Sequence, residues 1–213
     1  MRRAISAEWS GRARMDDFGA PTEIEGELYR ARPVESYDAA CLRGRFASGT
    51  EFSAALAHCC EKPLGVRVEV FGAKGRAWVD DDGKSIGNSL DLPLPPPIQE
   101  DGILVAWRDY LEYAKGRRQR PPNFLVDTRP YVLTTNGMLI SSGGIHTIPE
   151  AHARLFGEGE NAGYEASGIH ALVEECGRSG RLFSEQGAPW ARKGRPVSLA
   201  DLDSLNLKDY RSR

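Results

Sequence analysis

The sequence predicts an α+β protein with an open, mostly antiparallel sheet of about six strands and helices packed on one face. Three observations lead to this prediction. Residues 66–79 alternate apolar and polar side chains on both sides of Gly72 and Gly75, which is typical of a β-hairpin. Similar segments precede this hairpin, and three segments with helical spacing follow it. The turns between the strand segments are short, which favours antiparallel pairing.

Six strand segments are expected in the first half of the chain, separated by turn residues such as Ser48-Gly49. They are Thr22–Arg30, Asp38–Ala47, Glu51–Cys60, Val66–Phe71, Arg76–Asp80 and Ser85–Leu90. One face of the sheet collects the apolar residues Ile24, Leu28, Leu42, Phe46, Phe52, Leu56, Val66, Val68 and Val70. The other face collects the charged residues Glu25, Glu27, Arg43, Arg45, Glu51, Arg67 and Glu69. The apolar face must therefore be covered by helices.

Helical segments follow the proline-rich stretch 92–97, which marks the passage from sheet to helices. The first helix is expected to begin after Asp101, its N-cap, and to end before Gly116. Its apolar residues at helical spacing are Ile103, Trp107, Tyr110, Leu111 and Ala114. A second helix is expected from Pro130 to Ser141. A third is expected between Ser167 and Gly177, with inward-facing residues Ile169, Leu172, Val173 and Cys176.

Length and composition allow one domain of ordinary size with a hydrophobic core. The 213 residues are 40% hydrophobic and include 28 basic and 30 acidic residues, for a net charge of -2. A charge this close to zero does not draw the whole chain to nucleic acid or to an anionic membrane. The start of the chain lacks a secretory signal, and no apolar stretch approaches the ~18 residues of a membrane span. A cytoplasmic protein without nucleic-acid or membrane partners is therefore expected.

The chain contains four cysteines, Cys41, Cys59, Cys60 and Cys176. They lack C-x-x-C spacing, and the two neighbouring cysteines point to opposite faces of a strand. Neither a zinc site nor a disulfide framework is predicted, so we expect reduced thiols buried in the core.

Two short motifs resemble parts of a nucleotide-dependent enzyme, and both are better explained as turns. Gly157–Ala162 fits G-x-G-x-x-A, but no strand pattern precedes it, and Glu158 and Glu160 would place negative charge beside a pyrophosphate. The tripeptide Glu61-Lys62-Pro63 places a lysine between a glutamate and a proline, but it lies between two strands of a meander. Because G-x-S-x-G is also absent, no catalytic, cofactor-binding or metal-binding residue is assigned.

The candidate substrate-binding residues are Tyr37, Asp38 and His58. Tyr37 and Asp38 begin the second predicted strand, and His58 lies near the end of the third. In an antiparallel pair these two ends are adjacent, so a phenol, a carboxylate and an imidazole can gather at one sheet edge. His58 shares a strand face with Phe52 and Leu56, so a core histidine, which is the more common case, is the alternative to a pocket rim.

Several segments, taken in order, resemble the C-terminal domain of the Gfo/Idh/MocA family, named after glucose-fructose oxidoreductase, inositol dehydrogenase and rhizopine catabolism. They are Glu35–Ala39, Arg45–Gly49, Val68–Gly75, Trp107 with Gly116, Ser141–His146 and Ser184–Ala191. The most particular of them is the last, Ser-Glu-Gln-Gly-Ala-Pro-Trp-Ala. The resemblance divides the chain into a preceding segment, 1–18, a substrate and oligomerisation domain, 19–192, and a C-terminal tail, 193–213.

Members of this family pair an N-terminal Rossmann domain with such a C-terminal domain and oxidise or reduce sugars and polyols with NAD(P). The resemblance therefore implies the substrate-binding and oligomerisation domain of an NAD(P)-dependent sugar or polyol oxidoreductase. Residues 1–18 are too few for the G-x-G-x-x-G turn or the family's catalytic Glu-Lys-Pro, and the tripeptide at Glu61 falls in the wrong part of the fold. We therefore expect no cofactor in this chain and no catalytic competence without a Rossmann domain.

The partners that the resemblance implies are a second copy bound through the open, charged sheet face, a separate Rossmann domain, and a small sugar or polyol. Opposite charges on adjacent strands of that face can pair within or across an interface. The alternative is a stand-alone, non-enzymatic assembly or carbohydrate-binding module derived from the family.

Overall fold

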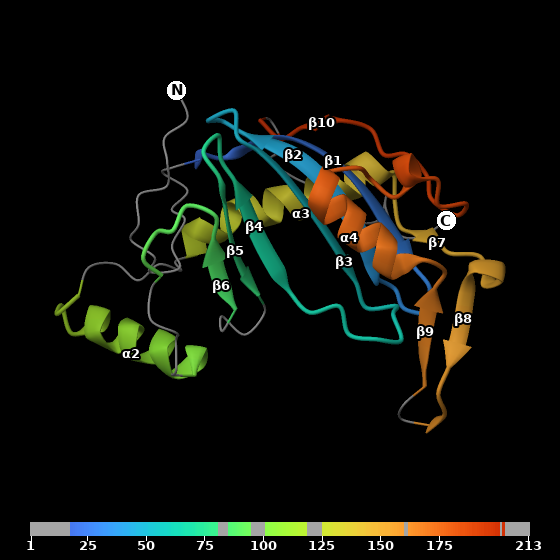
Figure 1. The fold of residues 1–213 in the computed structure, drawn as a ribbon, viewed down its shortest axis with the longest axis horizontal. Helices are drawn as coiled ribbons and strands as arrows, with labels where there is room; N and C mark the ends of the chain where they lie inside the picture. The colour runs from blue at the N-terminus through green and yellow to red at the C-terminus, as the bar shows by residue number, and fades with distance from the viewer. Residues whose placement is uncertain are drawn as a thin grey trace. The chain divides into compact units, whose positions relative to one another are not determined.

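The computed structural model describes residues 18–80, 85–94, 101–118, 125–159, 162–200 and 202 (Figure 1). The chain divides into two compact units. Unit 1 contains Gly65–Leu125, and unit 2 contains Arg14–Leu64 and Val126–Arg213. The division falls inside the region 19–192, which the sequence predicts as one domain.

Unit 2 is built on a sheet with the strand order β10-β1-β2-β3, in which β7 also pairs with β1. The strands are β1 (Pro21–Arg30), β2 (Ala39–Phe46), β3 (Glu51–Ala57), β7 (His146–Thr147) and β10 (Val197–Ser198). The pairs β1–β2, β2–β3 and β1–β10 are antiparallel, and β1–β7 is parallel. The β2–β3 turn contains Gly49 at a φ of 82°, a conformation that glycine adopts without strain.

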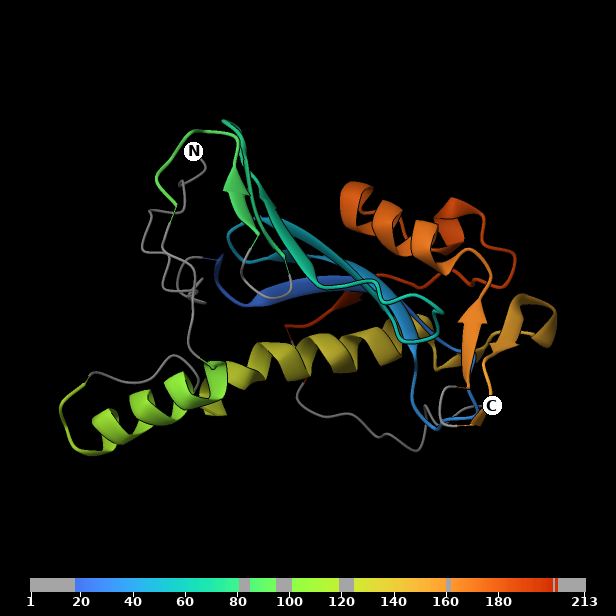
Figure 2. The same cartoon turned by 60° about the horizontal axis from the view of Figure 1, so that its bottom comes forward.

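Helix α3 (Arg129–Ser142) packs along β1 on one face of this sheet (Figure 2). It closes a core formed by Ile24, Leu28, Ala40, Leu42, Met138 and Leu199. The helix approaches closely at Gly137, where a Cβ atom would lie 2.5 Å from Leu199 Cδ2 and 2.7 Å from Ile24 Cγ2. The predicted apolar face is therefore confirmed for Ile24, Leu28 and Leu42, with Phe52 packed at its margin. The prediction is wrong for four other members, which are exposed: Leu56, Val66, Val68 and Val70.

The end of α3 also provides hydrogen-bond acceptors for the backbone of β1. It does so in the part of β1 that lies between the residues paired with β10 and those paired with β7. Gly26 N donates to Ser141 Oγ at 2.8 Å, and Leu28 N donates to Ser142 Oγ at 3.0 Å. Ser141 Oγ in turn donates to Arg195 O at 2.6 Å. Because a buried N–H without a partner costs about 1–3 kcal/mol, these two serines fix the end of the helix against the strand.

Helix α4 (Ile169–Ser179) covers β3 on the opposite face of the sheet, so helices lie on both faces rather than on one (Figure 2). Ile169 and Cys176 are buried, and Leu172 and Val173 pack against the same core, as the helical spacing predicts. The strand pattern does not predict this second core, because its face of β1 carries Glu27. The Glu27 carboxylate can be buried because it accepts hydrogen bonds from Tyr29 and Ser184.

A hairpin of β8 (Ala153–Phe156) and β9 (Gly163–Ala166) precedes α4. The prediction that no strand comes before Gly157 is therefore wrong, because pairing with β9 makes a strand of a segment that lacks alternation. The G-x-G-x-x-A match lies where this hairpin turns, and Gly157 and Gly159 have positive φ values. A dinucleotide loop instead joins a strand to a helix, so the motif is a hairpin turn.

In unit 1 the antiparallel strands β4 (Arg67–Phe71), β5 (Arg76–Asp80) and β6 (Ile86–Asn88) form a separate sheet. All six predicted strands and the α+β class are confirmed, but the strands are distributed over two sheets. The Trp78 ring lies over Gly87 and is flanked by the guanidinium groups of Arg67 and Arg76, 5.9 and 5.3 Å from its centroid. These contacts organise one face of the small sheet.

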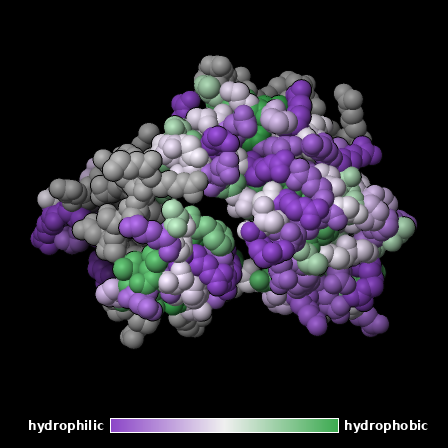
Figure 3. Space-filling model, turned by 45° about the horizontal axis from the view of Figure 1, so that its top comes forward, coloured by the Kyte–Doolittle hydropathy of each residue, from purple (hydrophilic) through white to green (hydrophobic). Residues whose placement is uncertain are grey.

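Helix α2 (Gly102–Ala114) belongs to unit 1 and has the predicted ends. Asp101 Oδ1 accepts a hydrogen bond from Ile103 N at 2.7 Å, and Gly116 follows the helix at a φ of 69°. Hydrophilic side chains cover most of the molecular surface in view, with apolar side chains gathered in a few patches (Figure 3). Within the described part of the chain, no helix is both long and apolar enough to cross a membrane.

The substitution Gly137→Ala tests the close packing of α3. We expect it to destabilise the protein by about 1–3 kcal/mol, because the new methyl group overlaps buried Leu199 and Ile24. Gly177→Ala in α4 is the matched control, since its Cβ meets nothing within 4 Å and should stabilise the helix by about 0.5–1 kcal/mol. Urea unfolding measures both. Equal stabilisation by the two substitutions would contradict the close approach of α3.

Candidate functional site

The structure brings the three predicted site residues together at the joined ends of β2 and β3. Asp38 directly precedes β2, His58 directly follows β3, and His58 N donates to Asp38 O at 2.7 Å. Their exposure differs, since Asp38 is buried, Tyr37 is half-buried and His58 is exposed. The backbones are therefore adjacent, while the side chains have different surroundings.

The Asp38 carboxylate shapes the loop between β1 and β2. Its Oδ1 accepts a hydrogen bond from Ala31 N at 2.9 Å. Its Oδ2 accepts from Arg32 N at 2.9 Å and from Arg32 Nε at 3.1 Å. Because both oxygens of this buried side chain are engaged by the loop, Asp38 has a structural role that the sequence reading did not assign to it.

Tyr37 and His58 are the two members of the predicted set with accessible side chains. Tyr37 packs against the core under α3. Burial, and to a smaller extent the nearby Tyr131, raises the pKa of the Tyr37 phenol, so the hydroxyl stays protonated. The prediction of a core position for His58 is wrong, because β3 ends at Ala57 and the ring lies in solvent beyond it. A hydroxyl donor and an imidazole therefore border this end of the sheet.

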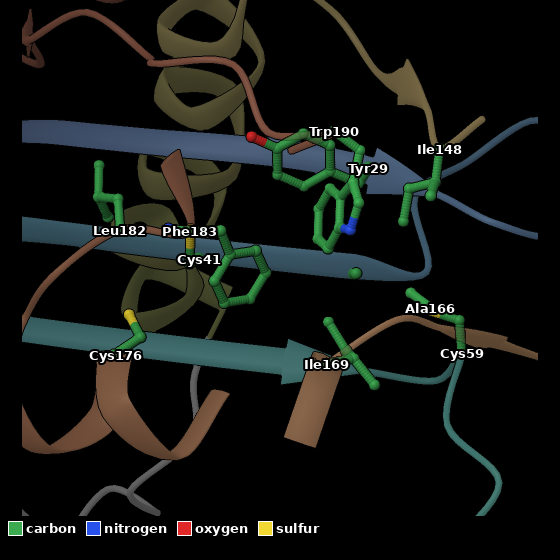
Figure 4. Close-up of a cluster of buried hydrophobic side chains, with 11 residues drawn as sticks. Tyr29, Cys41, Cys59, Ile148, Ala166, Ile169, Cys176, Leu182, Phe183 and Trp190 are labelled. Atoms are coloured by element: carbon green, nitrogen blue, oxygen red, sulfur yellow. The ribbon is translucent and has the colours of Figure 1, made fainter. Parts of the chain in front are cut away.

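The segment Leu182–Ala191, which we call the strap, covers the charged face of β1 and β2. Its Phe183 and Trp190 pack around Tyr29 of β1 (Figure 4). The Tyr29 and Trp190 rings meet edge to face with centroids 4.9 Å apart, and the Tyr29 and Phe183 centroids are 6.1 Å apart. Aromatic pairs in this geometry contribute about 0.5–1.5 kcal/mol beyond burial. The strap is therefore part of the core of unit 2.

A fully buried carboxylate, Glu27, fixes the strap to the sheet. Its Oε2 accepts hydrogen bonds from Tyr29 Oη at 2.8 Å and from Ser184 N at 3.1 Å, and Ser184 Oγ donates to Oε1. Tyr29 Oη also accepts from Arg192 N at 2.9 Å. Burial, and then the charge of Glu27, raise the pKa of Tyr29, so its phenol remains a donor at neutral pH.

Glu185, which follows Ser184 in the strap, pairs with charged residues on the same face of the sheet. Arg43 Nη2 lies 2.7 Å from Glu25 Oε2 and 2.8 Å from Glu185 Oε1, and Arg43 Nη1 lies 2.8 Å from Glu185 Oε2. Burial opposes ionisation of Glu185, but its hydrogen bonds with Arg43 and Leu182 N lower its pKa overall. The bidentate geometry makes this pair stronger than an ordinary surface pair.

The prediction of an open, charged sheet face is therefore wrong for β1 and β2. Glu27 is buried there because the strap supplies hydrogen-bond donors to it. Glu25 is buried beside Arg43 of β2, which also pairs with Glu185 of the strap. An oligomer remains a prediction, but it cannot use this part of the face while the strap is in place.

The strap and α4 line a groove of about 450 Å³. Its polar groups are the Ser167 hydroxyl, the Glu175 carboxylate, the Arg181 guanidinium and the Gln186 amide. Gln186 Nε2 donates to Leu172 O at 3.0 Å and to Arg181 O at 2.8 Å, which holds the wall of the groove. The hydrogen bond from Arg178, and then that from Ser179, lower the pKa of Glu175, so this wall carries a negative charge at neutral pH.

This groove, in which four polar residues lie beside a larger apolar lining, suits a small molecule that carries hydroxyl groups. Sequence reasoning did not find it, because α4 and the strap are brought side by side only by packing on β1–β3. The only sequence feature that pointed to this region was the motif Ser184–Ala191, which forms most of the strap.

The other chemistry-bearing residues have structural partners. All four cysteines are free, and Cys41 Sγ accepts from Phe183 N at 3.3 Å. The predicted burial is confirmed for Cys41, Cys59 and Cys176, whereas Cys60 is half-buried. Burial raises the pKa of Cys59 to about 12. Glu61 in the β3–β4 loop pairs with Arg154 at 2.5 Å. No group of three or more histidine, cysteine or acidic residues in the described ranges could hold a metal ion.

Comparisons with known proteins found no matching family model, no matching curated protein and no matching solved structure. The resemblance to the Gfo/Idh/MocA family therefore rests on the segments quoted from the sequence.

The substitution Glu185→Gln tests the ion network through pH. The pKa of Glu185 is lower in the folded protein than its unfolded value of ~4.3, so its stabilisation is complete above that value and is lost as pH falls through the folded pKa. We expect Glu185→Gln to lower the free energy of unfolding by about 1 kcal/mol at pH 7. The difference from the parent protein should shrink towards zero below about pH 3.

Urea unfolding between about pH 7 and pH 3 measures this difference. Glu174→Gln, on the exposed side of α4, is the control and should change stability by no more than about 0.5 kcal/mol at any pH. A pH-independent loss for Glu185→Gln, or an equal loss for the control, would show that the charge of Glu185 contributes nothing.

Proposed function

We propose that this chain is the substrate-binding and oligomerisation domain of an NAD(P)-dependent sugar or polyol oxidoreductase. Hydride transfer would then need a Rossmann domain as a partner. The strap carries the proposal. The most specific segment of the family resemblance is also the segment whose Ser184 and Glu185 close the sheet through Glu27 and Arg43. These contacts give the segment a structural role in this chain.

The architecture of the sheets supports the same proposal. Nucleotide-binding domains of the Rossmann type use parallel strands joined by helices, with the phosphate at a strand–helix turn. The strand pairs described here are antiparallel, apart from β1 with β7. The resemblance implies an open sheet with helices for the substrate domain. The antiparallel pairing supports this, whereas the covered second face of the unit 2 sheet does not.

We place the sugar or polyol in the groove between α4 and the strap. Four polar residues line it, of which Glu175, Arg181 and Gln186 also have partners within the protein. In the Tyr37–Asp38–His58 cluster, both oxygens of the only carboxylate are engaged by the β1–β2 loop. Tyr37 and His58 are the second location. The alternative function, a stand-alone assembly or carbohydrate-binding module, is supported by the way unit 2 covers both faces of its own sheet.

The first test is a titration with NADH and NADPH. We expect neither to raise the unfolding temperature at micromolar concentrations, because a ligand stabilises a protein only by binding its folded state. A saturable increase with a micromolar dissociation constant would contradict the proposed division between substrate and nucleotide domains.

The second test locates the substrate. Among a panel of polyols and sugars, we expect at least one to bind, and Ser167→Ala to weaken that binding by about fivefold, as for the loss of one hydrogen bond of ~1 kcal/mol. His58→Ala is the matched control and should leave the affinity unchanged. The reverse pattern would move the site to Tyr37 and His58, and no binding by any member would contradict substrate binding.

Sequencing of the coding DNA upstream of Met1 separates the two functions. An in-frame extension of roughly 150 codons with G-x-G-x-x-G and a later Glu-Lys-Pro would support the oxidoreductase. A stop codon directly before Met1 would favour the stand-alone module.

A further inference from the structure

Helix α2 carries a stripe of large apolar side chains that lie in solvent. The stripe consists of Ile103, Leu104, Trp107, Tyr110 and Leu111, each between 50% and 68% exposed. These positions fall three or four residues apart, so they form one continuous face of the helix. Isolated exposed apolar residues are normal, but a continuous stripe of this size marks an interaction surface.

The strands of unit 1 do not cover this stripe. Among the described residues of the unit, no strand packs against α2, although the sequence predicts that helices cover the sheet. The helix itself is well formed, with a capped N-terminus and a glycine after its last turn. Its apolar face nevertheless has no partner within the described part of unit 1, and a helix of 13 residues gains most of its stability from packing.

The apolar residues of the stripe are spaced symmetrically about Trp107, which favours a second copy of the same helix as the partner. Trp107 lies at its centre, with Leu104 and Tyr110 three residues to either side and Ile103 and Leu111 four residues to either side. In an antiparallel pair of identical helices centred on Trp107, Ile103 of one copy faces Leu111 of the other. Leu104 faces Tyr110 in the same way. Every large apolar residue of the stripe then meets a large apolar residue.

We propose that α2 pairs antiparallel with α2 of a second copy, with the two Trp107 side chains at the two-fold axis. Charge supports this direction. Residues 101–107 carry one acidic residue, Asp101, whereas residues 108–118 carry four basic and two acidic residues. An antiparallel pair places the acidic end of each helix beside the basic end of its partner and opposes the two helix dipoles. A parallel pair would bring like charges together.

The area of the stripe sets the strength of this dimer. Covering the exposed parts of five large side chains removes on the order of 500 Å² per copy, since each aromatic residue buries ~150–250 Å² when fully covered. A standard stable interface buries about 800 Å² per partner. The pair is therefore expected to be weak and concentration-dependent. Its existence does not depend on the proposed function.

Sedimentation velocity over a concentration series of the full chain tests the pairing. We expect a monomer at low micromolar and a dimer at high micromolar concentration. Trp107→Glu should raise the dimerisation midpoint at least tenfold, because it places two like charges at the axis. Leu155→Glu is the matched control, since Leu155 is 60% exposed outside α2, and it should leave the midpoint unchanged.

A charge-swapped mixture keeps the test independent of folding defects. Trp107→Glu mixed with Trp107→Lys should form a heterodimer that neither variant forms with itself. Direction is tested with Ile103→Cys and Leu111→Cys, whose mixture should form an intermolecular disulfide under mild oxidation faster than either variant alone. A monomer at all concentrations, a dimer that survives Trp107→Glu, or preferential Ile103→Cys self-linking would each overturn the proposal.

Discussion

The buried carboxylate of Glu27 is the interaction on which the architecture of unit 2 depends. A charged group without water needs several donors, and here the backbone and hydroxyl of Ser184 and the phenol of Tyr29 provide them. Because two of those donors belong to the strap, the charge can be buried only when the strap lies on the sheet. Arg43 of β2 makes a second link between the strap and the sheet, because it pairs with both Glu25 of β1 and Glu185 of the strap.

This polar anchoring gives the sheet of unit 2 two covered faces of different character. On one face α3 packs through small residues and aliphatic side chains, and its terminal serines satisfy the edge of β1. On the other face the strap and α4 build a core of aromatic and cysteine side chains around a polar centre. The groove proposed for a sugar or polyol lies where α4 and the strap meet, so the same contacts that stabilise the fold also form the wall of that site.

Unit 1, in contrast to unit 2, leaves large apolar side chains exposed. Its small sheet is organised by Trp78 and two arginines, and α2 presents its apolar stripe to solvent. A chain with a closed unit and a unit with exposed apolar surface is suited to assembly, since only the second needs a partner to complete its burial. The proposed α2 pair uses that surface.

The sequence by itself determined the local elements, because their signals are local. Alternation located β1 to β6, Asp101 and Gly116 bounded α2, and helical spacing identified the inward face of α4. It did not determine which elements meet. Glu25 and Glu27 read as solvent-facing because a charged residue is buried only when distant partners are present, and Ser184, Glu185 and Arg43 are brought together by packing alone. His58 and Asp38 were adjacent as expected, but only the tertiary structure decided that one lies in solvent and the other shapes a loop.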